Sequence, residues 1–115
     1  MPASDRVNTR APEPSLSARR GRCIWLDGPL LKACRVLRAR LGPLGYRVVC
    51  RANLPDPLIA ELAAKTGCAL ATTDEYLAAL ARRLGARAAL IDAGRAARKS
   101  ARDLATLILR SLAQA

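Results

Sequence analysis

Hydrophobic positions beyond residue 21 fall into two alternating patterns. Short continuous apolar runs, bounded by turn residues, are typical of buried strands. They occupy 22–27, 46–50, 68–72 and 88–91. Between these runs, apolar residues recur every three or four positions, which predicts amphipathic helices. We expect helices at 29–41, from a cap at Asp56 to Gly67, at 74–84 and at about 96–112.

Strand and helix therefore alternate four times between residues 22 and 115. Apolar strands separated by helices imply right-handed crossovers, and these produce a parallel sheet with helices on both faces. The predicted fold class is α/β, a Rossmann-like three-layer sandwich with a four-stranded parallel sheet. One such domain accounts for residues 22–115.

The first 21 residues differ from the rest because they show no apolar periodicity. They hold three of the seven prolines, with four arginines and two acids, and we expect a disordered basic arm. No apolar run approaches the roughly 20 residues that a membrane-spanning helix needs. No basic segment followed by an apolar one marks a signal peptide. The sequence thus predicts a cytoplasmic protein without a membrane partner.

The charge balance points to an anionic partner. Twenty basic residues, 17 of them Arg, stand against nine acidic ones, a net charge of +11. RNA is the expected partner, since each phosphate contact releases counterions and Arg binds phosphate at two points. A compositional bias that enriches Arg and Ala together is the alternative. Aromatic residues make up only 3%, which argues against base stacking on exposed rings.

The absence of histidine and the spacing of the four cysteines exclude several kinds of catalytic and metal site. Without His, the chain has neither a Ser-His-Asp triad nor imidazole metal ligands. The four cysteines form no C-x-x-C pair, so a structural zinc site is not expected. Inside a cell their default state is the reduced, buried thiol, with disulfides as the alternative. The four cysteines are Cys23, Cys34, Cys50 and Cys68.

Four aspartates lie just beyond the four expected strands, one after each: Asp27, Asp56, Asp74 and Asp92. The carboxyl ends of parallel strands share one edge of the sheet, where ligands bind, so these side chains should converge. Clustered carboxylates repel one another unless protons or a cation neutralise them, and Mg²⁺ or Mn²⁺ suits oxygen ligands. For each residue alone the alternative is structural: Asp56 and Asp74 as helix caps, Asp27 and Asp92 in turns.

Hydroxyl and basic side chains accompany these acids. Thr72 and Thr73 precede Asp74, and a hydroxyl there either orients the carboxylate or binds a phosphate. Basic residues near the expected edge are candidates for binding the substrate backbone. We assign this role to Lys32, Arg35 and Arg51.

Three segments resemble PIN-like nuclease domains, most of all the compact branch found as toxins in toxin–antitoxin pairs. They are WLDGPL at 25–30, DPLIAELA at 56–63 and ALATTD at 69–74. The resemblance extends over about residues 23–91. It implies a ribonuclease that depends on Mg²⁺ or Mn²⁺ and has a Rossmann-like sheet.

The matched positions imply roles for individual residues. Asp27, Asp56 and Asp74 correspond to the family's catalytic and metal-binding aspartates, and Thr72 to the threonine before the last of them. Asp92 has no counterpart in the family. We include it as a metal ligand from its position after the fourth strand.

Departures from the family pattern leave other functions open. Gly28 and Pro29 stand where the family has an acidic and a polar residue, and no Glu lies between Cys50 and Asp56. One alternative is a catalytically degenerate PIN-like RNA-binding module in a ribonucleoprotein assembly. Another is a toxin whose basic helices hold an acidic antitoxin-like protein. A homodimer is also predicted, through an apolar face of the last helix that Leu109 widens.

Overall fold

The protein is described by a computed structural model that covers residues 22–51 and 53–115. The expected arm at 1–21 lies outside the described residues. Four strands form one sheet, all parallel, in the order β3-β2-β4-β5. They are β2 (Cys23–Leu26), β3 (Arg47–Cys50), β4 (Ala69–Thr72) and β5 (Ala88–Leu90). The predicted α/β class and four-stranded parallel sheet are confirmed.

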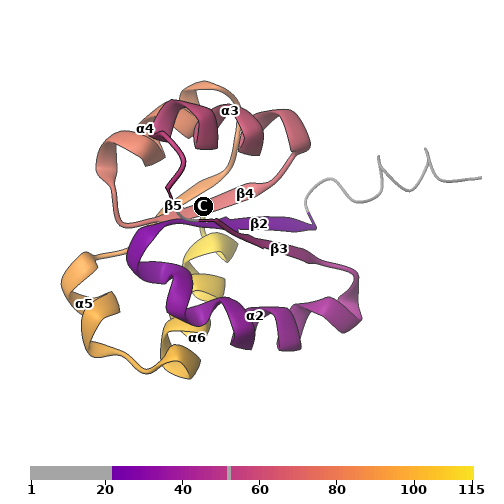
Figure 1. Ribbon diagram of the computed structural model, residues 1–115, viewed down its shortest axis with the longest axis vertical. Coiled ribbons are helices and arrows are strands. Elements are labelled where there is room, and N and C mark those ends of the chain that lie inside the picture. Colours follow the sequence, from indigo (N-terminus) through magenta and orange to yellow (C-terminus); the bar gives the residue numbers. More distant parts are fainter. Residues whose placement is uncertain (1–21, 52) are drawn as a thin grey trace, which may run out of the picture.

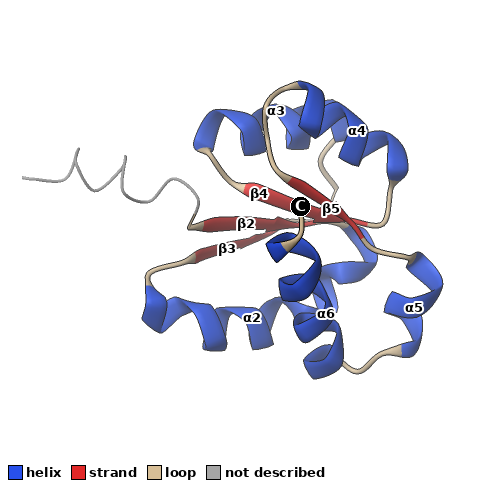
Figure 2. Ribbon diagram, turned by 180° about the vertical axis from the view of Figure 1, so that it is seen from behind, coloured by secondary structure: helices blue, strands red, loops and turns tan. Residues whose placement is uncertain are grey.

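Helices cover both faces of the sheet, as Figure 1 shows. One face carries α3 (Asp56–Thr66) and α4 (Glu75–Arg83). The other carries α2 (Cys34–Leu41), α5 (Ala93–Arg98) and α6 (Ala101–Ala113). The view from behind in Figure 2 shows the same three layers, with the sheet between the two groups of helices. The three-layer sandwich follows the prediction.

The sheet separates two hydrophobic clusters. Along β2, Ile24 and Leu26 pack toward α2 and α6, while Cys23 and Trp25 pack toward α3 and α4. Successive side chains of a strand point to opposite faces, so a strand buried on both faces needs apolar residues at every position. This requirement explains why the strands appear as uninterrupted apolar runs in the sequence.

Two expected helices differ from the structure. The segment predicted at 29–41 begins as a 3-10 helix, η1 (Gly28–Ala33), before α2, and a second 3-10 turn, η2 (Gly42–Leu44), follows it. The single helix predicted at 96–112 is wrong, because α5 and α6 are separate. Lys99 is extended, and the Ser100 side chain accepts a hydrogen bond from the Asp103 N–H at 3.1 Å. This S-x-x-D pattern is a helix-start signal in the sequence.

The start of α3 also differs from prediction. Pro55, and not Asp56, is the capping residue, and Asp56 is the first helical residue. The helix buries Ile59, Ala60 and Ala63. Leu58 lies beside that buried face and is 39% exposed.

The four cysteines are paired, so the expectation of reduced thiols is wrong. Cys23 bonds to Cys68, and Cys34 bonds to Cys50. Strand pairing explains the first bond, because the register that aligns Ile24 with Ala69 places the two preceding cysteines side by side, with Cα atoms 4.5 Å apart. Disulfides persist in oxidising surroundings, and intracellular proteins of hyperthermophiles are the known exception.

The helices of the described ranges are short and amphipathic. Within residues 22–51 and 53–115, none has both the length and the apolar character that crossing a bilayer requires.

Candidate functional site

The parallel register brings Asp27 and Asp74 to one edge of the sheet. We call this the carboxyl edge, because all four strands end there. Asp27 follows β2, and its N–H donates a hydrogen bond of 3.2 Å to the carbonyl of Ala71 in the neighbouring β4. Asp74 comes two residues after the end of β4. The two aspartates therefore leave adjacent strands at the same level.

Thr72 connects these two residues directly. Its hydroxyl donates to Oδ2 of Asp27 at 2.9 Å and accepts from the N–H of Asp74 at 3.0 Å. The threonine is 0% exposed. A buried hydroxyl has no surface to offer a phosphate, so this geometry favours the orienting role over the substrate-binding role. Thr73, the next residue, is half-buried.

Asp74 begins α4 as its capping residue. Oδ1 accepts hydrogen bonds from the N–H groups of Tyr76 at 2.9 Å and Leu77 at 3.2 Å. An aspartate in this position satisfies otherwise unpaired donors of the first turn. Both bonds use the same oxygen, which leaves Oδ2 outside the cap. Asp74 therefore caps the helix as predicted, and only one of its two carboxylate oxygens is used in the cap.

Asp56 has a different arrangement from the one predicted. Its side chain makes no capping hydrogen bond in α3, so its expected role as a cap is wrong. Instead, the carboxyl group is close enough to Asp74 for a hydrogen bond between the two side chains to contribute to its raised pKa. Since α3 packs beside α4 on the same face of the sheet, the first turns of the two helices bring these acids together.

Electrostatics link all three aspartates. Burial raises the pKa of the Asp56 carboxyl, and the hydrogen bond with Asp74 and the negative charges of Asp74 and Asp27 raise it further. A like charge nearby disfavours ionisation, which is the physical cause of these last contributions. Asp27 and Asp74 therefore lie at the same edge of the sheet, and Asp56 is near enough for their charges to raise its pKa. We call these three residues the aspartate cluster.

Asp92 lies apart from the aspartate cluster. It follows β5 at the same edge, but its Oδ2 accepts a hydrogen bond from the Arg95 N–H at 2.9 Å and caps α5. It is exposed, and no contact between it and the cluster is found in the described ranges. The geometry favours its structural role over the predicted role as a metal ligand.

The aspartate cluster is not a preformed metal cage. In the part of the chain that the structure describes, no three His, Cys, Asp or Glu side chains are arranged to hold a metal ion. One oxygen of Asp27 bonds to Thr72 and one of Asp74 caps α4. Mg²⁺, however, is usually bound through one or two carboxylates, with water and substrate phosphate completing its shell. The Asp56–Asp74 pair meets that smaller requirement with oxygen donors of the right kind.

Basic side chains gather on the α2 face of the sheet. Lys32 and Arg35, both predicted to bind substrate, line a hollow of about 420 Å³ together with Arg38. The 3-10 helix η1 begins directly after Asp27, so this hollow starts near the carboxyl edge. Arg38 was missed by sequence reasoning, although its spacing of three residues from Arg35 on one helix is a visible signal.

Arg51 occupies the other side of Asp27. The register pairs Leu26, the last residue of β2, with Cys50, the last residue of β3, so Arg51 and Asp27 follow neighbouring strands. Its side chain lines a separate hollow of about 370 Å³ with Trp25, Arg47 and Leu58 among others. The predicted basic residues therefore fall into two groups and do not form one continuous surface.

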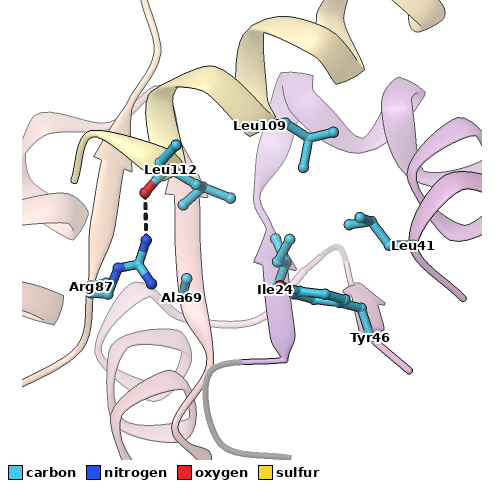
Figure 3. A pocket seen from close by; sticks show the side chains of 8 residues that line it. Ile24, Leu41, Tyr46, Ala69, Arg87, Leu109 and Leu112 are labelled. Atoms are coloured by element: carbon cyan, nitrogen blue, oxygen red, sulfur yellow. Dashed lines mark hydrogen bonds between the residues drawn. The ribbon is translucent and has the colours of Figure 1, made fainter. Parts of the chain in front are cut away.

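A further hollow lies at the opposite edge of the sheet, where the strands begin (Figure 3). Its volume is about 180 Å³, and Ile24, Tyr46 and Leu109 contribute apolar walls. Arg87 donates a hydrogen bond of 2.5 Å to the Leu112 carbonyl on its rim. This hollow is remote from the aspartate cluster, and it has no part in the chemistry proposed below.

Comparison with known proteins adds no relative. No protein-family model, curated protein or solved structure matches this chain. The residues at the carboxyl edge and the segments at 25–30, 56–63 and 69–74 are therefore the basis for a proposed function.

Proposed function

We propose that the chain is a PIN-like nuclease that hydrolyses RNA phosphodiesters with Mg²⁺ or Mn²⁺. The observation that carries the proposal is that Thr72 joins Asp27 and Asp74 by two hydrogen bonds, with Asp56 close to both acids. Burial, a hydrogen bond with Asp74 and the charges of Asp74 and Asp27 raise the pKa of Asp56, and a bound cation would offset the repulsion among these charges. The basic hollow beside Asp27 supports a polyanionic substrate.

Asp56 and Asp74 would hold the metal, with Asp27 completing the set. When bound, such an ion activates a water molecule and stabilises negative charge on a phosphate oxygen. Thr72 fixes the Asp27 carboxylate by its hydrogen bond and holds the backbone of Asp74 at the same time. Lys32 and Arg35 would neutralise phosphates of the RNA chain next to the reacting one.

Cleavage of a fluorescent, mixed-sequence RNA with Mg²⁺ tests the proposal. Asp56→Asn and Asp74→Asn should each lower the rate by about a hundredfold or more, since each removes a charge that metal catalysis uses. Asp92→Asn is the matched control, because Asn also caps helices and Asp92 lies outside the cluster. Full activity in the first two variants would reject the nuclease assignment.

A non-catalytic RNA-binding module is the second candidate. It is favoured by the lack of a preformed three-ligand arrangement in the described residues, and by Gly28 and Pro29 after Asp27. This candidate predicts binding in EDTA that weakens with salt and no cleavage on adding Mg²⁺. The same RNA, measured with and without metal, separates the two functions.

We also propose that the chain is a toxin that binds an acidic antitoxin-like protein. Arg47 and Arg51 beside the exposed Leu58 form a surface that suits an acidic, partly apolar peptide of an antitoxin-like protein. Copurification of the native protein with an acidic companion tests this. The homodimer through the face that includes the half-buried Leu109 stays a prediction, as does the cytoplasmic location.

A further inference from the structure

The aromatic side chain of Tyr76 is exposed to solvent. Trp25 is 7% exposed, and Tyr46 packs against the core, whereas Tyr76 is 66% exposed. Single exposed apolar residues are common on protein surfaces, so exposure alone assigns nothing. The exposure of Tyr76 becomes relevant because this residue lies next to Asp74 at the start of α4.

Tyr76 lies on the rim of the aspartate cluster. Its N–H donates to Oδ1 of Asp74 at 2.9 Å, so its backbone is bonded to the carboxylate that contacts Asp56. The next residue, Leu77, is completely buried and anchors this turn of α4. Tyr76 therefore stands on a rigid turn two residues after Asp74, and its ring is exposed to solvent.

The two faces of the sheet contribute different groups around the carboxyl edge. The cations Lys32, Arg35 and Arg38 belong to η1 and α2 on one face. Tyr76 belongs to α4 on the opposite face, as the layers in Figure 1 show. A nucleic acid strand laid across the edge would meet charge for its phosphates on one side of the acids and an aromatic surface on the other.

This inference depends on the function proposed above. We propose that Tyr76 is a substrate-positioning residue that stacks on an unpaired base next to the phosphodiester held at Asp56 and Asp74. Bases inside a duplex are already stacked on their neighbours, whereas bases of a single strand are free to stack on a protein ring. The substrate is therefore single-stranded. The low aromatic content predicted no stacking, but one ring at the right position is enough.

Binding measured in EDTA tests the proposal without any cleavage. Fluorescence anisotropy gives the affinity for a labelled single-stranded RNA and for a duplex of the same sequence. Tyr76→Ala should weaken single-strand binding about five- to hundredfold, the range known for base–aromatic stacking, and leave duplex binding unchanged. Tyr76→Phe keeps the ring and should bind as the unchanged chain does. Leu44→Ala, at an equally exposed position (61%), is the control and should have no effect.

The proposal is overturned if Tyr76→Ala binds the single strand normally. It is also overturned if both RNA forms weaken equally, or if the unchanged chain does not bind the single strand. A melting curve like that of the unchanged chain shows that the variant is folded. Cleavage is measured separately with Asp74→Asn, so a chain that stacks RNA without cutting it would reject the nuclease and retain the role of Tyr76.

Discussion

Thr72 and Asp27 lie 45 residues apart in the chain and are joined by a hydrogen bond of 2.9 Å. The bond exists because β2 and β4 are parallel neighbours that end at the same level. It sets the orientation of one carboxylate of the aspartate cluster, while the same hydroxyl holds the backbone of the next. A buried side chain without contact with solvent thus organises the proposed site.

Replacing this hydroxyl should therefore affect stability and activity together. Thr72→Val keeps the shape but leaves Oδ2 of Asp27 and the Asp74 N–H without a partner, at a cost of about 1–3 kcal/mol. Thr72→Ser retains the hydroxyl and should lose less. Urea denaturation gives the stability, and RNA cleavage gives the activity. Equal stability and activity of the Val and Ser variants would show that the hydroxyl orients nothing.

The raised pKa of Asp56 predicts a stability that depends on pH. The folded chain holds this proton more tightly than the unfolded chain, so its stability falls as pH rises from the ordinary Asp value of 3.8 through the raised pKa. Asp56→Asn removes the repulsion with Asp74 and Asp27. Above the raised pKa it should melt at a higher temperature than the unchanged chain, and the difference should shrink toward pH 3.8.

Melting temperatures across that pH range provide the check, with Asp92→Asn as control. The control makes the same change at an exposed aspartate outside the cluster. An Asp56→Asn variant that is less stable at neutral pH would mean that the three charges do not repel one another.

The two disulfides should contribute unequally to stability. They close loops with sequence separations of 45 and 16 residues. In the chain-entropy model, these loops correspond to about 4 and 3 kcal/mol. Denaturation of the double variants Cys23→Ala/Cys68→Ala and Cys34→Ala/Cys50→Ala measures both. The half-buried pair Cys34–Cys50 should also be reduced first, as alkylation followed by mass spectrometry would show. Stability that does not change on full reduction would contradict this account.

The basic hollow predicts how RNA binding responds to salt. If Lys32, Arg35 and Arg38 each contact a phosphate, removing one of them should lower the slope of log affinity against log salt by about one. Lys65→Ala, at the exposed end of α3, should leave the slope unchanged. Slopes that are the same in all four variants would place the RNA elsewhere.

Sequence patterns predicted the sheet well and individual contacts less well. Apolar runs located each strand of residues 22–51 and 53–115, because a strand buried on both faces has a distinct pattern. The positions of Asp27 and Asp74 followed from strand topology alone. The role of Asp56 did not, since a shift of one residue at the start of α3 decides whether its side chain caps the helix or faces Asp74.

Contacts between distant segments account for the remaining differences. The bond between Cys23 and Cys68 depends on which strands are neighbours, and spacing along the chain does not contain that information. The break at Lys99 was visible in the sequence as a capping pattern at Ser100. Tyr76 was overlooked because composition counts aromatic residues and does not locate them.

Binding of Mn²⁺ tests the central claim most directly, because it asks whether the aspartate cluster holds a metal without requiring any substrate. Calorimetric titration of the whole chain should show Mn²⁺ binding that weakens about tenfold or more in Asp56→Asn and Asp74→Asn, each of which loses a carboxylate ligand. Asp92→Asn should bind as the unchanged chain does. If Mn²⁺ does not bind, or binds equally well in all four proteins, then the three acids form no metal site.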